Sequence, residues 1–245
     1  MTKAYPLAPI EEAVCAINLP RTVNWDMTVP GAFYERIKAD YPFKEVLQGR
    51  EISLPVKSGS LPELRGIERI KFSSPDRKSV VILEERGMAI SRLRPYTSWE
   101  RLMPQIRAVF NNLSQVVEIS SLLRVGLRYI NRLEVPHNAG GLEDYFEFRP
   151  HMGKIMTHSG PASFMIGVEI PYQDKRDVCR VQLMKTLPND PHNDAFILDL
   201  DYFLARPNAL PVEDLDDWIE AAHGRIGQLF EDSLTERMKA TFRGD

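Results

Sequence analysis

The sequence predicts an α+β fold in which antiparallel strands form a curved sheet with long helices across one face. Segments that alternate apolar and polar side chains occur in runs, which is typical of antiparallel sheets. Two long segments instead carry an apolar stripe at helical spacing. The order strand, short helix, three or four strands, long helix occurs in residues 1–117 and again in residues 118–245. We therefore expect two similar α+β halves within one compact unit.

The first half begins with a strand in which every second residue is apolar and which ends at Pro20. A short helix is expected over residues 30–42, because Pro30 suits a helix start and Pro42 a helix end. Strands are expected at 45–54, 67–73, 79–84 and 88–93, with a mobile loop at 55–66.

A long helix is expected in residues 94–117, where the apolar stripe includes Trp99, Ile106 and Phe110. Thr97 and Glu100 have the spacing of a capping box, in which a hydroxyl and a carboxylate bond to the first backbone N–H groups. Pro104 would then lie beyond the first turn, so we expect a kink or a later helix start.

The second half follows the same order. We expect a strand at 122–135, a short helix at 141–150, strands at 162–170, 178–187 and 195–204, and a long helix at 212–242. Two such units side by side would form a continuous curved sheet, as in TATA-binding-protein-like and helix-grip folds. A likeness of fold does not carry a function.

Composition excludes several classes of protein. The chain has 245 residues, 43% apolar and 27% charged, with a net charge of −3, which argues against a protein that coats nucleic acid or an anionic membrane. No apolar run approaches the roughly 18 residues that span a bilayer, and the N-terminus lacks the apolar stretch of a signal peptide. Cys15 and Cys179 lie in strand-like segments, so we expect buried free thiols and a cytoplasmic protein.

The sequence contains none of the common motifs for nucleotide, dinucleotide, zinc or serine-hydrolase chemistry. His137, His151 and His158 are close in sequence, but their spacing matches no zinc pattern. His223 is expected to be a partly buried structural residue on the last long helix. We therefore predict no catalytic residue, metal or cofactor, and a protein that is not an enzyme, although an enzyme without recognised motifs stays open.

The segment at 122–135, "LLRVGLRYINRLEV", concentrates positive charge. In a strand, Arg124, Arg128 and Arg132 project to one side, about 13 Å apart from neighbour to neighbour, too far for one small anion to touch all three. Two interpretations stay open. The arginines pair with acids on neighbouring strands, candidates being Glu84, Glu169, Asp199 and Asp201, or they form a surface for a ligand or partner.

The other side of this strand is apolar except for Tyr129 and Asn131. A buried amide must be hydrogen-bonded, so Asn131 is expected to tie the strand end to a loop or helix terminus, and Asn18 occupies a similar place in the first half. Asp199 and Asp201 are expected on a solvated strand face. The candidate binding residues are Arg124, Arg128, Tyr129, Asn131 and Arg132.

Four segments together resemble one family: "LAPIEEAV", "RPYTSWE", "VGLRYINRLEV" and "WIEAAHGRIGQLFEDSLTE". It is a sporadically distributed prokaryotic family of about this length with a GLRYINR motif and no assigned function. The resemblance implies a cytosolic protein of an accessory or defence-type system and supplies no catalytic residues. We expect a non-enzymatic interaction protein, acting on a protein partner or another copy of itself through a sheet face or the junction of its halves. The alternative is a binder of a small ligand or nucleotide signal, with a membrane excluded and nucleic acid disfavoured.

Overall fold

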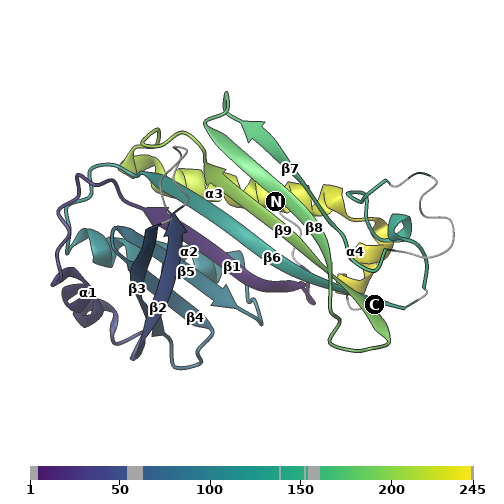
Figure 1. Ribbon diagram of the computed structural model, residues 1–245, viewed down its shortest axis with the longest axis horizontal. Coiled ribbons are helices and arrows are strands. Elements are labelled where there is room, and N and C mark those ends of the chain that lie inside the picture. Colours follow the sequence, from purple (N-terminus) through teal and green to yellow (C-terminus); the bar gives the residue numbers. More distant parts are fainter. Residues whose placement is uncertain (1–4, 54–62, 138, 152, 154–160, 244–245) are drawn as a thin grey trace.

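A computed structural model describes residues 5–53, 63–137, 139–151, 153 and 161–243. These residues form a nine-stranded antiparallel sheet in the order β2-β3-β4-β5-β1-β6-β9-β8-β7 (Figure 1). Its strands are β1 (Ile10–Asn18), β2 (Phe43–Ser53), β3 (Glu63–Ser73), β4 (Ser79–Glu84), β5 (Gly87–Leu93), β6 (Arg124–Pro136), β7 (Met165–Tyr172), β8 (Asp177–Thr186) and β9 (Asn193–Leu204). The predicted α+β class with a large antiparallel sheet is confirmed.

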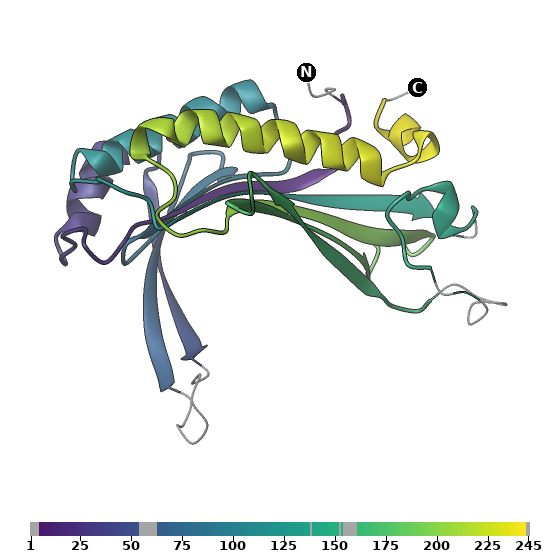
Figure 2. The ribbon, with the colours of Figure 1, turned by 90° about the horizontal axis from the view of Figure 1, so that it is seen from above.

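The helices lie on one face of the sheet and leave the opposite face uncovered (Figure 2). They are α1 (Val29–Ile37), α2 (Trp99–Ser114), α3 (Leu215–Ser233) and α4 (Glu236–Arg243). Most residues of the apolar stripes predicted for the long helices are buried, with Ile106 of α2 and Ala222 of α3 fully enclosed. Trp99, Leu229 and Phe230 of the same stripes are half-buried. Burial of these stripes against the sheet supplies the main apolar core. We refer below to the covered face and the open face of the sheet.

Strand β6 lies in the middle of the sheet, between β1 and β9. Val125, Leu127 and Leu133 are fully buried on the covered face, and the intervening side chains are exposed or half-buried on the open face. β1 pairs with β6 from Asn18↔Arg124 to Ile10↔Asn131, with a register shift near Glu11. The two-residue period therefore gives β6 two chemically different surfaces.

The last long helix is interrupted, contrary to the prediction of one helix over 212–242. A short 3-10 turn, Val212–Asp214, precedes α3, and Leu234 is extended (φ −120°, ψ 144°) between α3 and α4. Leu234 is buried and forms a β-bridge with Phe146, while the N–H of Thr235 donates to the carbonyl of Tyr145. These long-range backbone bonds replace the helical ones at the break.

The predicted short helix at 141–150 is only a 3-10 turn, Leu142–Asp144. Backbone hydrogen bonds to the end of α3 again replace helical ones. The backbone N–H groups of Glu147 and Phe148 donate to the carbonyl of Ser233 at the end of α3, so the segment does not continue as a helix. Tertiary contacts have overridden a local helical pattern.

The start of α2 also differs from the prediction. Ser98, not Thr97, is the N-cap, and it makes no side-chain capping bond, so the predicted capping box is wrong. The helix starts at Trp99 and includes Pro104, consistent with the expected later start.

Most of the predicted loop at 55–66 lies outside the described residues, and Glu63 and the three residues after it belong to β3. Among the described helices, none is both long and apolar enough to cross a bilayer.

Candidate functional site

The arginines of β6 have three different environments on the open face. Arg128 makes a bidentate pair with Asp199 of β9: Nε donates to Oδ1 at 2.8 Å and Nη2 to Oδ2 at 2.5 Å. Asp199 is almost completely buried, whereas the Arg128 side chain is 47% exposed. The pairing of an arginine with an acid on the neighbouring strand therefore holds for this residue.

Arg132 is hydrogen-bonded to groups within the fold. Its Nε donates to Glu134 at 3.0 Å on the same strand, and its Nη2 donates to the carbonyl of Leu187 at 2.6 Å. Arg124 makes no ion pair within the described residues; its guanidinium lies 4.4 Å from the centre of the Phe203 ring of β9. Thus Arg124 is the one of the three that has no hydrogen-bonded acceptor within the described residues, whereas Arg128 and Arg132 each commit two of their five N–H donors.

The acids that were expected to face solvent are less accessible than predicted. Asp199 is buried under its arginine, so its assignment to a solvated face was wrong. Asp201 is half-buried, and desolvation raises its pKa, while the neighbouring Arg128 and Arg124 oppose that rise. The remaining expected partners bind elsewhere: Glu84 accepts from Arg69 and Glu169 accepts from Arg180.

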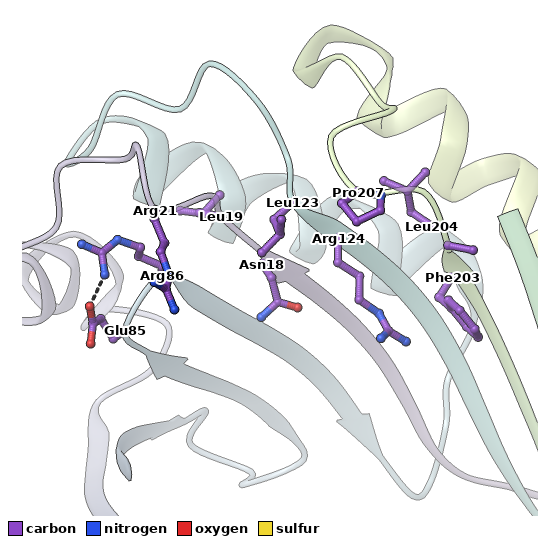
Figure 3. A pocket seen from close by; sticks show the side chains of 11 residues that line it. Asn18, Leu19, Arg21, Glu85, Arg86, Leu123, Arg124, Phe203, Leu204 and Pro207 are labelled. Atoms are coloured by element: carbon purple, nitrogen blue, oxygen red, sulfur yellow. Dashed lines mark hydrogen bonds and ion pairs between the residues drawn. The ribbon is translucent and has the colours of Figure 1, made fainter. Parts of the chain in front are cut away.

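A hollow of about 910 Å³ opens where β1 and β9 end and β6 begins; we call it the arginine hollow. Its polar lining is Arg21, Arg86, Arg124, Glu85 and Asn18 (Figure 3). Figure 3 shows the side chains of Asn18, Arg21 and Arg124 extending toward the same side of the sheet. Its apolar lining is Leu19, Leu123, Phe203, Leu204, Ala205 and Pro207.

Positive charge is only partly compensated in the arginine hollow. Arg86, in the tight turn between β4 and β5 with φ 58°, pairs with Glu85 and donates to the carbonyl of Val23. Arg21 and Arg124 make no ion pair within the described part of the chain. The hollow therefore carries two guanidinium groups, those of Arg21 and Arg124, that form no ion pair within the described residues and lie beside apolar side chains.

The covered face of β6 lines a second space, a cavity of about 290 Å³ between α2, α3, the sheet and the segment Tyr5–Ile10; we call it the aromatic cavity. The Tyr129 hydroxyl lies 3.1 Å from Nδ1 of His223 and 3.3 Å from the hydroxyl of Tyr96. The Trp99 indole stacks on His223, with ring centres 4.0 Å apart and an angle of 4°. The strand and the helix α3 thus contribute Tyr129 and His223 to one hydrogen-bonded cluster, which the ring of Trp99 covers.

Burial shifts the titration of this cluster. Desolvation raises the pKa of Tyr129 well above its ordinary value and lowers the pKa of His223 below 6.5, although Glu220 and Glu100 oppose the second shift. The hydroxyl is therefore protonated and the imidazole neutral near pH 7. His223 is half-buried as predicted, but it borders the cavity.

Asn131 also borders the aromatic cavity and is buried, as expected. Its Nδ2 donates to the carbonyl of Leu198 at 3.1 Å, so it ties β6 to β9 and not to a loop or helix terminus. The analogy with Asn18 fails because Asn18 pairs in register with Arg124 and shares its open face. Sheet register decides which face each amide occupies.

The structure brings the five candidate residues of β6 to different places. Arg124 lines the arginine hollow, Tyr129 and Asn131 line the aromatic cavity, and Arg128 and Arg132 lie on the open face with internal partners. Sequence reasoning missed Arg21 and Arg86, which come from a loop and a turn. Proximity to strand ends was the signal: Arg21 follows Pro20, and Arg86 precedes the first residue of β5.

Cys15 and Cys179 are buried free thiols, as predicted, and burial raises the pKa of each to about 12. No cluster of metal-ligating side chains occurs among the described residues, which do not include His158.

No protein-family model matches the chain, and no curated protein is significantly similar to it.

Proposed function

We propose that this chain is a non-enzymatic binding protein whose arginine hollow receives an acidic segment of a partner protein. The observation that carries the proposal is the pair of guanidinium groups, Arg21 and Arg124, that make no ion pair within the described residues and lie beside exposed apolar surface. Arginine suits this task because its planar fork binds a carboxylate in two places. The apolar lining would receive a hydrophobic side chain next to the acid, with Leu123 37% exposed.

The rest of the open face supports a protein partner over nucleic acid. Other basic side chains described on its strands have acidic partners within 4 Å, in the pairs Arg69–Glu84, Lys71–Glu45, Arg128–Asp199, Arg132–Glu134 and Arg180–Glu169. A nucleic acid is bound by a continuous basic surface that neutralises many phosphates. Among the strand residues described on the open face, Arg124 is the basic side chain without an ion pair, and it lies in one hollow with Arg21, which suits a short acidic segment.

The hollow also fits the hypothesis of two similar halves, 1–117 and 118–245. β1 and β6 would be the corresponding first strands, and they lie next to each other in the sheet. Their neighbouring ends, at Asn18 and Arg124, border the hollow. A TATA-binding-protein-like saddle built in this way would place the partner at the junction. A role in a prokaryotic accessory or defence-type system, in the cytoplasm, rests on the family resemblance alone.

The test removes the two free charges without touching a structural bond. The double variant Arg21→Gln/Arg124→Gln is compared with Arg36→Gln/Arg101→Gln, which makes the same charge change at exposed arginines elsewhere. Partners are captured from the source cells and identified by mass spectrometry, and binding of the partner's acidic peptide is then measured by fluorescence polarisation. We expect at least about a tenfold loss of affinity for the first variant only.

Added salt should weaken peptide binding to the wild type, and reversal of the peptide's acidic residues to lysine should abolish it. Equal binding by both double variants would overturn the proposal. Dimer formation that is lost in the first variant would identify a second copy of the chain as the partner. Binding of duplex DNA with a steep salt dependence would show that the partner is a nucleic acid instead.

A further inference from the structure

The aromatic cavity on the covered face has the opposite electrostatic character to the arginine hollow. Five aromatic residues line it: Tyr5, Tyr96, Trp99, Tyr129 and Phe230. Two carboxylates, Glu100 and Glu231, also line it, and its lining among the described residues includes no lysine or arginine. Aromatic faces carry negative charge density, so these rings and the carboxylates favour the same kind of ligand.

The carboxylates around this cavity are incompletely compensated. Glu231 accepts from the Tyr5 hydroxyl at 3.0 Å and lies 3.7 Å from Lys239. Glu100 and Glu220 make no ion pair within the described residues. Glu220 accepts from the Trp99 indole N–H at 2.8 Å, so a carboxylate lies next to one of the aromatic rings that line the cavity.

The polar groups inside the cavity do not supply a compensating cation. His223 is stacked under Trp99 and bonded to Tyr129, and burial favours its neutral form. The nearest elements contribute Glu100 from α2, Tyr129 from β6 and Glu220 from α3 itself. A neutral imidazole and phenol leave the net charge at the cavity negative at neutral pH.

We infer that the aromatic cavity binds a small organic cation, an ammonium group attached to an apolar body. The ammonium would be held by the aromatic rings and by Glu100, and the body would contact Ile226, Leu200 and Ile10. Cation–π contacts of this kind hold an ammonium more strongly when the rings shield it from water. The site lies on the opposite side of β6 from the arginine hollow and does not depend on the partner proposed there.

The experiment uses probes that share a shape and differ in charge: choline, its uncharged carbon isostere 3,3-dimethylbutan-1-ol, and the anion 3,3-dimethylbutanoate. Benzyltrimethylammonium serves as a larger cation. Binding is followed by thermal shift and by tryptophan fluorescence, since Trp99 lines the cavity. We expect at least one cation to bind at millimolar concentration or below, about tenfold or more tightly than the uncharged isostere, with no binding of the anion.

The matched variants are Glu100→Gln and Glu118→Gln, two exposed glutamates of which only the first borders the cavity. Glu100→Gln should weaken cation binding several-fold, and Glu118→Gln should leave it unchanged. Gly227→Leu, which fills the cavity from α3, should abolish it. Equal affinity for choline and its carbon isostere, or no binding of either cation, would overturn the inference. Loss of cation binding in Arg21→Gln/Arg124→Gln would contradict the independence of the two sites.

Discussion

The two faces of strand β6 handle polarity in opposite ways. On the open face, Arg128 and Arg132 form ion pairs with carboxylates, which offset the desolvation of the partly buried charges. On the covered face, Tyr129 and Asn131 are uncharged and form hydrogen bonds within the fold, through the Tyr129 hydroxyl and the Asn131 Nδ2. Charged side chains without an ion pair within the described residues border both spaces: Arg21 and Arg124 the arginine hollow, and Glu100 the aromatic cavity. One alternating strand thus contributes to two sites suited to ligands of opposite charge.

The largest expected effect is on the open face, at Arg128. Arg128→Leu should lower the free energy of unfolding by about 2–3 kcal/mol, because it leaves the buried Asp199 carboxylate unpaired. This figure is at the low end for a buried pair because the guanidinium itself is half-exposed and screened by water. Urea unfolding measures the change.

Arg180→Leu is the matched control on the same face. Its partner Glu169 has a side chain 55% exposed, so the loss should be at most about 1 kcal/mol. The double variant Arg128→Leu/Asp199→Leu should recover most of the stability that Arg128→Leu loses, since it removes the orphaned charge. Similar losses for Arg128→Leu and Arg180→Leu would show that burial of the acid does not distinguish the two pairs.

The covered face should respond to pH through His223. The pKa of this residue in the folded protein is below its ordinary value of 6.5, so the unfolded chain binds more protons in this range. The stability that the neutral imidazole contributes is complete above about pH 6.5 and is lost as the pH falls through the folded-state pKa. The wild type should therefore lose more stability than His223→Gln between neutral and mildly acidic pH.

NMR titration of the imidazole signals measures the same property directly. The His223 signal should titrate below 6.5, and Tyr129→Phe should change its titration because the hydroxyl at 3.1 Å is lost. A His223 pKa at or above 6.5 would show that Glu100 and Glu220 outweigh desolvation. The cavity would contain its own cation at neutral pH only if the measured pKa of His223 lay above 7.

The sequence predicted the α+β class, most strands and the buried stripes, because these follow from local periodicity. Of the two interpretations it left open for the arginines, pairing with an acid across strands holds for Arg128. It did not predict the break at Leu234 or the reduction of residues 141–150 to one turn, because both depend on backbone bonds between segments far apart in the chain. Likewise, Arg21 and Arg86 join Arg124 only through the strand order, which no local pattern contains.

The smallest expected effect on stability belongs to Arg124. Its contact with the Phe203 ring is an exposed cation–π interaction, so Arg124→Ala should cost about 0.5–1 kcal/mol, less than Arg128→Leu. For binding of the acidic peptide we expect the opposite order. Arg124→Ala should weaken binding more than Arg128→Leu, because Arg124 makes no ion pair within the described residues whereas Arg128 is paired with Asp199. Measuring unfolding and peptide affinity on both variants therefore separates structural arginines from binding ones on the same strand. If Arg128→Leu weakens binding more than Arg124→Ala while the fold stays intact, the paired arginine is the recognition residue and the arginine hollow is not the site.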